Sequence, residues 1–197
     1  MGEYTGEREH LTWDGFGEAC RDMARTIVAD GFVPEVVVAI ARGGLLPGGA
    51  IAYALGVKNC GALNVEFYTG IGTVLDAPEL LPPELDMEYL GGRRVLLVDD
   101  VADSGRTLAL AVRLLRDRGA DVRSATIYTK PGSIEMPDYS WRETPLWIDF
   151  LWSWKGSVLE EDAALADGSL ARSPRRGRHD PRVLGAFAHA RSPRQLS

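Results

Sequence analysis

The feature that most constrains the fold is the stretch of residues 94–107. It consists of four apolar residues, two adjacent acids (Asp99 and Asp100), a variable pair, and an Asp-Ser-Gly-Arg-Thr turn. A continuous apolar run of this length predicts a strand buried on both faces, as in a parallel sheet. The residues after the turn have helical composition up to Gly119. We therefore expect ligand-binding side chains where this strand ends and the helix begins.

The turn itself carries groups that suit a phosphate dianion. Backbone N–H groups at a helix N-terminus, two hydroxyls and a guanidinium come from Ser104, Gly105, Arg106 and Thr107. Ionised Asp99 and Asp100 only accept hydrogen bonds, which matches a pair of sugar hydroxyls or a divalent cation. Together these groups describe a site for a phosphorylated ribose. The alternative, a structural turn with incidental acids, leaves two carboxylates at a buried strand end without compensation.

A second strand-to-helix loop follows the same logic. Residues 36–41 form an apolar run that predicts a buried strand, and Arg42, Gly43 and Gly44 follow it. The glycines permit close approach of the backbone to an anion, and the Arg42 guanidinium can donate two parallel hydrogen bonds to phosphate oxygens. In isolation the loop is explained equally well as a glycine turn with a solvated arginine. Its place beside the 94–107 strand favours an anion site.

The remaining patterns complete an α/β chain. Its strand–helix units predict a doubly wound, mainly parallel sheet with right-handed crossovers. Helices are expected over residues 12–31 and 108–118, with a short helix that follows the loop 42–48 and ends near residue 55. Strands are expected over residues 62–68, 121–129 and 146–150.

Residues 94–107 resemble the phosphoribosyl-pyrophosphate (PRPP) motif of type I phosphoribosyltransferases. No Walker P-loop pattern occurs in the chain. Several segments together resemble the xanthine-guanine and hypoxanthine, or 6-oxopurine, branch of that family over about residues 10–155. In the family's order they are residues 12–14, 41–48, the PRPP motif, 129–132 and 147–152.

The resemblance implies a domain organisation. It places the type I phosphoribosyltransferase fold over residues 8–155, with a small base-binding hood from the C-terminal region, residues 130–155. Residues 69–92 are expected to form a flexible lid loop, the alternative being an ordered surface excursion. An acidic extension over 156–171 is expected next. A basic tail over 172–197 reads as disordered, either an arm for an anionic partner or a dispensable extension.

The resemblance also implies the PRPP site. Mg²⁺ is the expected cofactor, held with PRPP by the metal-binding residues Asp99 and Asp100. A cis peptide bond is expected in the loop from Ala41 to Gly43. The expected PRPP-binding residues are Arg42, Gly43, Asp99, Asp100, Asp103, Ser104, Gly105, Arg106 and Thr107.

By the same resemblance, the base is bound from the hood. Lys130 is expected to contact the exocyclic oxygen at purine C6, Trp147 to stack on the base, and the Ile148 backbone to hold its far edge. Asp103 is the expected catalytic residue, facing N7 and handling its proton. Its alternative role is to cap the helix. Ser153 stands where relatives often carry an acid, which leaves the choice among guanine, xanthine and hypoxanthine open.

The function expected from these residues is transfer of the 5-phosphoribosyl group of PRPP to a 6-oxopurine base in purine salvage. The alternatives are a regulator that senses PRPP or nucleotides, and the same reaction on another nucleobase. A regulator that binds nucleic acid needs a basic face, whereas the net charge is −6. Relatives are commonly homodimers or homotetramers, so the resemblance implies a homo-oligomer.

Composition, apolar segments and cysteines indicate the class of protein and its cellular location. With 45% hydrophobic and 25% charged residues, its composition is ordinary for a globular protein. Neither a basic and apolar leader nor a membrane-length apolar run is present, so we expect a cytoplasmic protein without membrane contact. Cys20 and Cys60 lie in apolar segments, and both are expected to be reduced thiols in or near the core.

Overall fold

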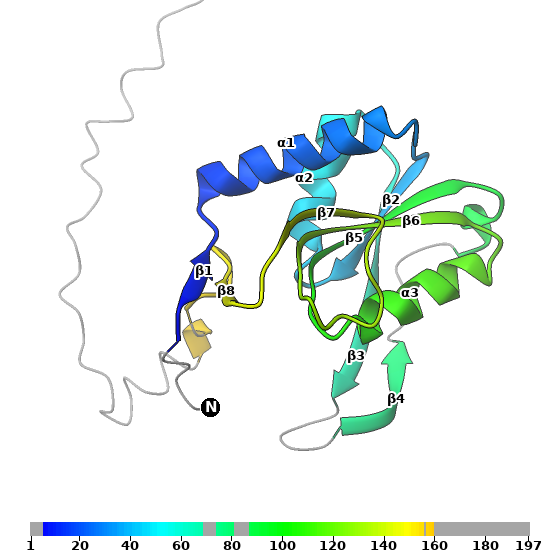
Figure 1. Cartoon of the computed structure of the whole chain (residues 1–197). Coiled ribbons are helices and arrows are strands. Elements are labelled where there is room, and N and C mark those ends of the chain that lie inside the picture. The colour runs from blue at the N-terminus through cyan, green and yellow to red at the C-terminus, as the bar shows by residue number, and fades with distance from the viewer. Residues whose placement is uncertain (1–5, 69–73, 81–86, 156, 160–197) are drawn as a thin grey trace, which may run out of the picture. The chain divides into compact units, whose positions relative to one another are not determined.

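The computed structural model places most of the chain (Figure 1). Contacts divide the chain into two units, residues 1–154 and residues 155–197. The fold described below belongs to the first unit. The described residues are 6–68, 74–80, 87–155 and 157–159.

Some expected segments lie partly or wholly outside the described residues. The basic tail over 172–197 is wholly outside, and so is most of the acidic extension over 156–171. Of the lid segment over 69–92, the backbone is described at residues 74–80 and 87–92. The lid, the hood and these boundaries therefore stay predictions.

One six-stranded sheet organises the first unit, with the order β4-β3-β2-β5-β6-β7. Neighbouring strands run parallel except β4, which is antiparallel to β3. This confirms the expected α/β fold with a doubly wound, mainly parallel sheet. The strands are β2 (Val36–Ala41), β3 (Cys60–Tyr68), β4 (Val74–Leu80), β5 (Arg94–Ala102), β6 (Asp121–Thr129) and β7 (Tyr139–Glu143).

The strand order reverses between β2 and β5. From β2 the chain continues through α2 (Leu45–Leu55) to β3 on one side, and from β5 through α3 (Arg106–Arg116) to β6 on the other. The loops that leave these two strands consequently diverge from the same point at the carboxyl edge. Open α/β sheets bind ligands at such a point. Both of the loops singled out in the sequence emerge there.

Helices cover both faces of this sheet. Helix α1 (Trp13–Ala29) packs against α2 on one face, while α3 packs on the other (Figure 1). Successive side chains of a strand point to opposite faces of the sheet, so the sheet has an apolar core on each face. Leu96 and Val98 face the α1 and α2 side, whereas Val95 and Leu97 face α3. The near-continuous apolar run of β5 is thus explained by burial on both faces.

A second, two-stranded sheet pairs the two ends of the first unit. Strand β1 (Arg8–His10) runs parallel to β8 (Trp147–Asp149). The sequence predicted β8 but not β1, because three consecutive polar residues carry no strand periodicity. Strand β1 exists through its pairing with a partner about 140 residues away. Strand β7 was also missed.

The segment between β3 and β5 contains strand β4 and the short 3₁₀ helix Glu88–Leu90. Strand β4 pairs back onto β3 as a hairpin, with a register irregularity between residues 66 and 68.

Two further expectations concern cysteines and membranes. Cys20 is buried in the α1 core, but Cys60 is exposed, which corrects the expectation that both lie in or near the core. Cys60 is the first residue of β3, where the chain enters the sheet from the surface. Within the described ranges, no helix combines the length and apolar character needed to cross a membrane.

Candidate active site

The two acids of the central motif lie at the carboxyl end of β5. Asp99 is only 9% exposed, and its Oδ1 accepts a hydrogen bond of 2.9 Å from the amide of Asp100. Burial raises the pKa of the Asp99 carboxyl well above its usual value, and the charge of Asp100 raises it further. Burial also raises the pKa of Asp100. Two ionised carboxylates here are therefore costly unless a cation or hydrogen-bond donors face them.

The loop after β2 packs directly onto these acids. The peptide bond between Ala41 and Arg42 is cis, as the resemblance predicted. A Cβ added to Gly43 would lie 2.2 Å from Oδ2 of Asp100, and one added to Gly44 would lie 2.4 Å from the carbonyl oxygen of Val98. Both glycines are thus required by close contact with β5. Arg42 is exposed beside them.

The turn after β5 is shaped by Gly105. Its φ of +78° is in the left-handed region, and a Cβ there would lie 2.4 Å from Ser133 Oγ. The Ser104 hydroxyl accepts a hydrogen bond of 3.4 Å from the Arg106 amide, and the Ser104 carbonyl accepts one of 3.0 Å from the Ile134 amide. The loop after β6 therefore braces the turn that leads into the N-terminus of α3.

Asp103 does not cap this helix. The N-cap of α3 is Gly105, which has no side chain to offer a capping bond. Asp103 is exposed and has no hydrogen-bond or ion-pair partner in the described part of the chain. The capping alternative for Asp103 is therefore wrong, and its carboxylate faces a cavity instead.

That cavity joins the residues expected to bind the base. Its volume is about 540 Å³. The amine of Lys130 donates a hydrogen bond to the carbonyl of Leu146, which lies just before Trp147. The Trp147 indole is 53% exposed. The lining residues are Asp103, Ser104, Lys130, Pro131, Gly132, Pro145 and Trp147.

The expected site residues form two neighbouring groups. Asp103, Ser104, Lys130 and Trp147 share the cavity, whereas Asp99, Asp100 and the loop at Arg42 and Gly43 meet at the ends of β5 and β2. Arg106 and Thr107 open α3. The side chain of Ile148 is buried in the core, so only its backbone is available to a ligand.

Sequence reasoning missed Trp152. A hydrogen bond from its indole lowers the pKa of Asp100, which partly offsets the effect of burial. The Trp152 ring stacks on Phe150 with centroids 5.0 Å apart and meets Phe16 of α1 edge-on at 5.6 Å. Aromatic clustering was visible in the sequence, but this pairing across the fold was not. Pro131, Gly132 and Pro145 were also missed as lining residues.

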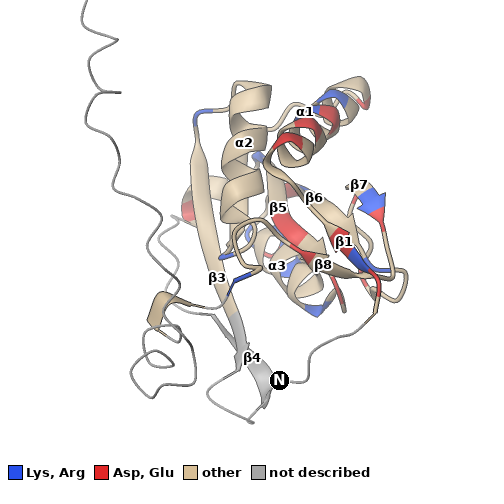
Figure 2. Ribbon diagram, turned by 90° about the vertical axis from the view of Figure 1, so that its left-hand side faces the viewer, with Lys and Arg blue, Asp and Glu red and all other residues tan. Residues whose placement is uncertain are grey.

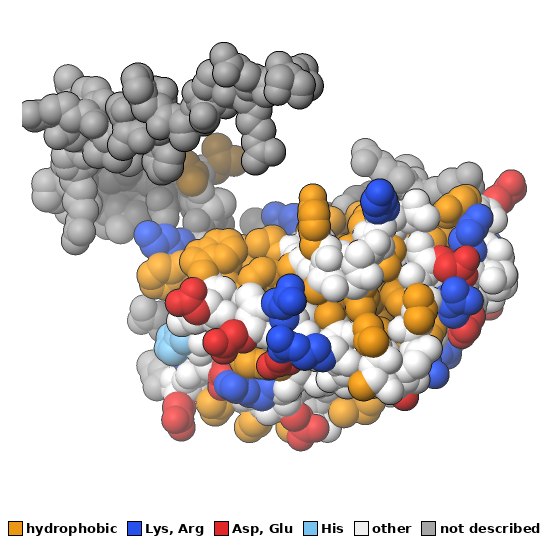
Figure 3. Space-filling model, turned by 90° about the horizontal axis from the view of Figure 1, so that it is seen from above, with side chains coloured by type: hydrophobic (Ala, Val, Ile, Leu, Met, Phe, Trp, Pro, Cys, Tyr) orange, Lys and Arg blue, Asp and Glu red, His pale blue; other side chains and the backbone are white. Residues whose placement is uncertain are grey.

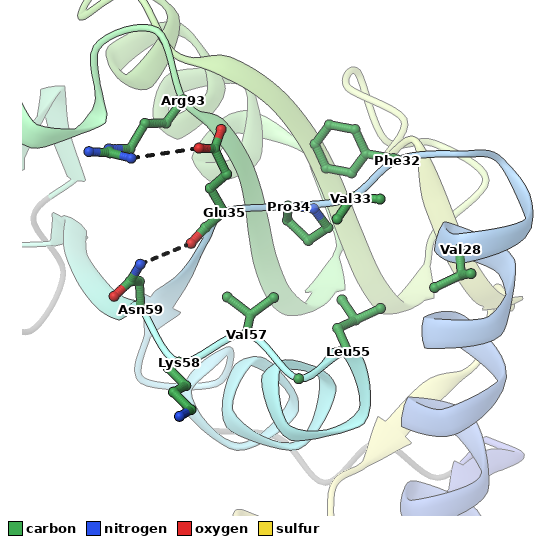
Figure 4. Close-up of a pocket in the computed structure, with 11 residues that line it drawn as sticks. Val28, Phe32, Val33, Pro34, Glu35, Leu55, Val57, Lys58, Asn59 and Arg93 are labelled. Atoms are coloured by element: carbon green, nitrogen blue, oxygen red, sulfur yellow. Dashed lines mark hydrogen bonds and ion pairs between the residues drawn. The ribbon is translucent and has the colours of Figure 1, made fainter.

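A separate cavity of about 460 Å³ lies at the opposite edge of the sheet (Figure 4). Val33, Val57 and other apolar side chains line it. Three of its polar residues interact with one another: Glu35 lies 3.6 Å from Arg93, and the Glu35 carbonyl accepts a 3.3 Å hydrogen bond from Asn59. These residues precede β2, β3 and β5, so the cavity lies away from the carboxyl edge.

Comparison with known proteins decides the family. The phosphoribosyl transferase domain matches residues 9–161. The chain belongs to this family. Among curated relatives, the xanthine-guanine phosphoribosyltransferase of Cereibacter sphaeroides is 33% identical over 155 residues, which cover 73% of this chain and 85% of that protein. The corresponding enzyme of Ruegeria sp. is also 33% identical over 155 residues, covering 73% and 84%.

Solved structures of the family share its architecture. The purine phosphoribosyltransferase of Pyrococcus horikoshii aligns with a TM-score of 0.67 and 30% identity, covering 78% of this chain and 98% of that one. A xanthine-guanine-hypoxanthine phosphoribosyltransferase of Helicobacter pylori aligns with a TM-score of 0.64 at 21% identity, covering 81% and 99%, and supports the fold alone. This chain is therefore a type I phosphoribosyltransferase, an enzyme of the glycosyltransferase class.

Proposed function

We propose that this phosphoribosyltransferase transfers the 5-phosphoribosyl group of PRPP to a 6-oxopurine base and releases pyrophosphate. The observation that carries this proposal is the shared cavity of Asp103, Lys130 and Trp147, which directly adjoins the turn at Ser104 and Gly105. A carboxylate and an ammonium group match the polar edge of a 6-oxopurine, and an exposed indole matches the face of its ring. The names of the curated relatives agree with this substrate class.

The phosphate of PRPP fits the turn into α3. The helix has 11 residues, and the amides of its first turn point out of its N-terminus, where an anion is favoured. The hydroxyls of Ser104 and Thr107 and the guanidinium of Arg106 add donors. Gly105 lets the chain make this turn, because its φ is positive and a side chain there would collide with the loop at Ser133.

The ribose and pyrophosphate fit the group at the ends of β2 and β5. Asp99 and Asp100 accept hydrogen bonds from the ribose hydroxyls, and Arg42 faces the leaving pyrophosphate. Mg²⁺ fits the same acids. Burial raises the pKa of both carboxyls, so their ionised forms need a compensating charge, and hard oxygen donors are the ligands that Mg²⁺ prefers.

The base fits the cavity itself. Lys130 has three N–H donors, one of which is directed to the Leu146 carbonyl, so further donors remain for an oxygen at purine C6. Trp147 stacks on the ring, and the backbone at Ile148 holds the opposite edge. An amino group at C6, as in adenine, would instead present its own donors to the Lys130 ammonium.

The chemical step follows from these positions. The bond between ribose C1 and the pyrophosphate oxygen breaks, and pyrophosphate leaves with the electron pair toward Arg42. Positive charge develops on the ribose ring, as it does in glycoside hydrolysis, while purine N9 forms the new bond to C1. Asp103 accepts the proton that leaves N7. When bound, Mg²⁺ would neutralise part of the negative charge of the phosphate groups. Positioning and electrostatics account for most of the acceleration.

The proposed enzyme acts as a homo-oligomer, and helix α2 is the candidate interface. Helix α2 carries no charged residue (Figure 2), and its outward side includes Leu45 and Tyr53, which are 46% and 92% exposed. Val28 of α1 is 61% exposed, and it lines a shallow groove together with Ala54 of α2. Hydrophobic side chains lie among charged ones on the face seen in Figure 3. A helix that is apolar on all sides is typically buried.

The proposal is tested by pyrophosphate release from Mg²⁺-PRPP with guanine, xanthine, hypoxanthine, adenine, uracil and orotate, each alone. Turnover with one or more 6-oxopurines supports the proposal. Turnover only with adenine or a pyrimidine would show that the enzyme acts on another base. Tight PRPP binding without turnover on any base favours the regulatory alternative.

A further inference from the structure

The strand that carries Trp147 is held by residues from the other end of the sequence. Strand β8 is only three residues long, and β1 is its partner in the two-stranded sheet, with Arg8 opposite Trp147 and His10 opposite Asp149. The amide of Leu11 adds a hydrogen bond of 3.2 Å to the Asp149 carbonyl. Such a short strand depends on its neighbour for its position.

Both carboxylate oxygens of Asp149 bind cationic or polar groups of β1. Oδ1 accepts a hydrogen bond of 2.8 Å from the Arg8 guanidinium, and Oδ2 lies 3.2 Å from Nδ1 of His10. The Asp149 side chain is 14% exposed and the Arg8 side chain 31%. This partial burial protects the pair from solvent screening that weakens most surface ion pairs. With both oxygens engaged, the Asp149 carboxylate has little freedom to rotate.

This ion pair lies on the same face of the small sheet as Trp147. Side chains alternate along a strand, so Trp147 and Asp149 share one face with Arg8 of the paired strand. The opposite face is anchored separately. Ile148 is buried in the core, and Glu9 accepts a hydrogen bond of 3.3 Å from the Tyr128 hydroxyl. The charged residues of β1 and β8 lie together in Figure 2.

Trp147 thus lies between two anchors. On one side, Lys130 binds the carbonyl of Leu146, the residue before it. On the other, Arg8 binds the side chain of Asp149, two residues after it. The indole is 53% exposed, and the backbone that carries it belongs to β8. The position of β8 therefore contributes to the orientation of the indole.

We infer that Arg8, acting through Asp149, is a positioning residue for the base site. The ion pair fixes β8 so that the Trp147 ring presents its face to the bound purine. Arg8 and Asp149 do not line the cavity, so their effect passes through the strand and not through contact with substrate. This inference rests on the proposed stacking of the base on Trp147.

The kinetic test compares Arg8→Met, Asp149→Asn and the double variant with the parent enzyme. Each single variant is expected to raise the KM for the base about three- to fivefold, with the KM for PRPP unchanged, as for the loss of a partly buried ion pair. The double variant is expected to match the single variants, because both remove the same interaction. Arg25→Met is the matched control, since it removes an exposed 2.7 Å ion pair with Asp22 on α1. A base KM in Arg8→Met equal to that of Arg25→Met overturns the inference.

A second readout needs no turnover. Protein labelled with 5-fluorotryptophan gives a fluorine resonance for each tryptophan, and the resonance lost in Trp147→Phe identifies Trp147. We expect Arg8→Met to shift or broaden that resonance and Arg25→Met to leave it unchanged. An unchanged Trp147 resonance in Arg8→Met contradicts the inference. If no base is turned over, the proposed function fails, and this spectrum still decides whether Arg8 positions Trp147.

Discussion

Gly43 packs directly against the carboxylate of Asp100. A Cβ added at Gly43 would lie 2.2 Å from Oδ2 and 2.4 Å from Cγ of that side chain, closer than real Cβ atoms approach other atoms. The glycine of the β2 loop and the acid of β5 therefore occupy one closely fitted corner. Any side chain at residue 43 must displace the carboxylate that we assign to the ribose and Mg²⁺.

The first prediction is that Gly43→Ala impairs PRPP use selectively. Displacing Asp100 should lower kcat/KM for PRPP about 100-fold, because misplacement by about 1 Å has effects of this order. The KM for the base should change little. Steady-state kinetics with each substrate varied in turn measures both effects.

Gly17→Ala, at an exposed position of α1, is the matched control for that variant, because nothing lies within 4 Å of a Cβ added at Gly17. The control should keep the parent kinetics. Equal PRPP kinetics in Gly43→Ala and Gly17→Ala would show that Asp100 has no such role.

The second prediction concerns stability and pH. The pKa of Asp99 is raised in the folded state, so the folded protein holds a proton that the unfolded chain releases. Stability from this group is complete below the unfolded pKa of about 3.9 and is lost as pH rises through the folded pKa. Asp99→Asn replaces the carboxyl by an amide that does not ionise, so the variant does not lose this stability as pH rises. Its unfolding midpoint should exceed that of the parent by a margin that grows from pH 4.5 to pH 8.

Thermal unfolding without divalent cations or PRPP measures this margin, about 2–4 °C for each kcal/mol of added stability. Asp121→Asn, at an exposed position, is the control. A margin for Asp99→Asn that stays constant or shrinks as pH rises is the result that the burial argument does not allow.

The third prediction separates base binding from PRPP binding. Trp147→Leu removes the stacking surface and should raise the KM for the base about tenfold, within the range of base–aromatic stacking energies. Lys130→Met keeps the length of the side chain but loses its donors, and it should reduce the preference for a 6-oxopurine over adenine. Both variants should keep the PRPP KM.

Trp154→Leu provides the comparison for the indole, since Trp154 is 67% exposed and is not among the residues that line the cavity. We expect its kinetics to match the parent. If Trp147→Leu also matches the parent, the base does not stack on Trp147.

The fourth prediction tests the α2 interface. Tyr53→Glu places a charge at the most exposed apolar position of α2 and should convert a homo-oligomer to monomers. Size-exclusion chromatography with light scattering gives the mass directly. Val158→Glu, at another exposed apolar position, should keep the parent mass. A monomeric parent protein, or an unchanged mass for Tyr53→Glu, rules out this interface.

Much of the fold was predictable because its determinants are local. The apolar runs of β2 and β5, and the turn residues that follow them, mark two buried strands and the loops that leave them. Strand β6 was predicted with its observed bounds. The topology then brings the ends of these strands together, as parallel sheets require. The cis bond at Ala41 followed from the family resemblance and not from any local pattern.

The parts that were missed depend on contacts between distant segments. Strand β1 forms through pairing with β8, and the hydrogen bond from Trp152 to Asp100 joins the segment after β8 to the central motif. Neither is encoded by periodicity. Pro145 lines the cavity next to Leu146, whose carbonyl accepts a hydrogen bond from Lys130, 16 residues earlier in the chain. Cys60 lies in an apolar segment, yet its place at the start of β3 exposes it.

The central claim, transfer to a 6-oxopurine, is tested most directly by comparing hypoxanthine with adenine, which differ at C6. The measurement is kcat/KM for nucleotide formation with saturating Mg²⁺-PRPP, with the product identified by chromatography. The account predicts that hypoxanthine is preferred about 100-fold or more, as expected where a site is built to hydrogen-bond the C6 oxygen. A ratio near one, or a preference for adenine, would contradict it.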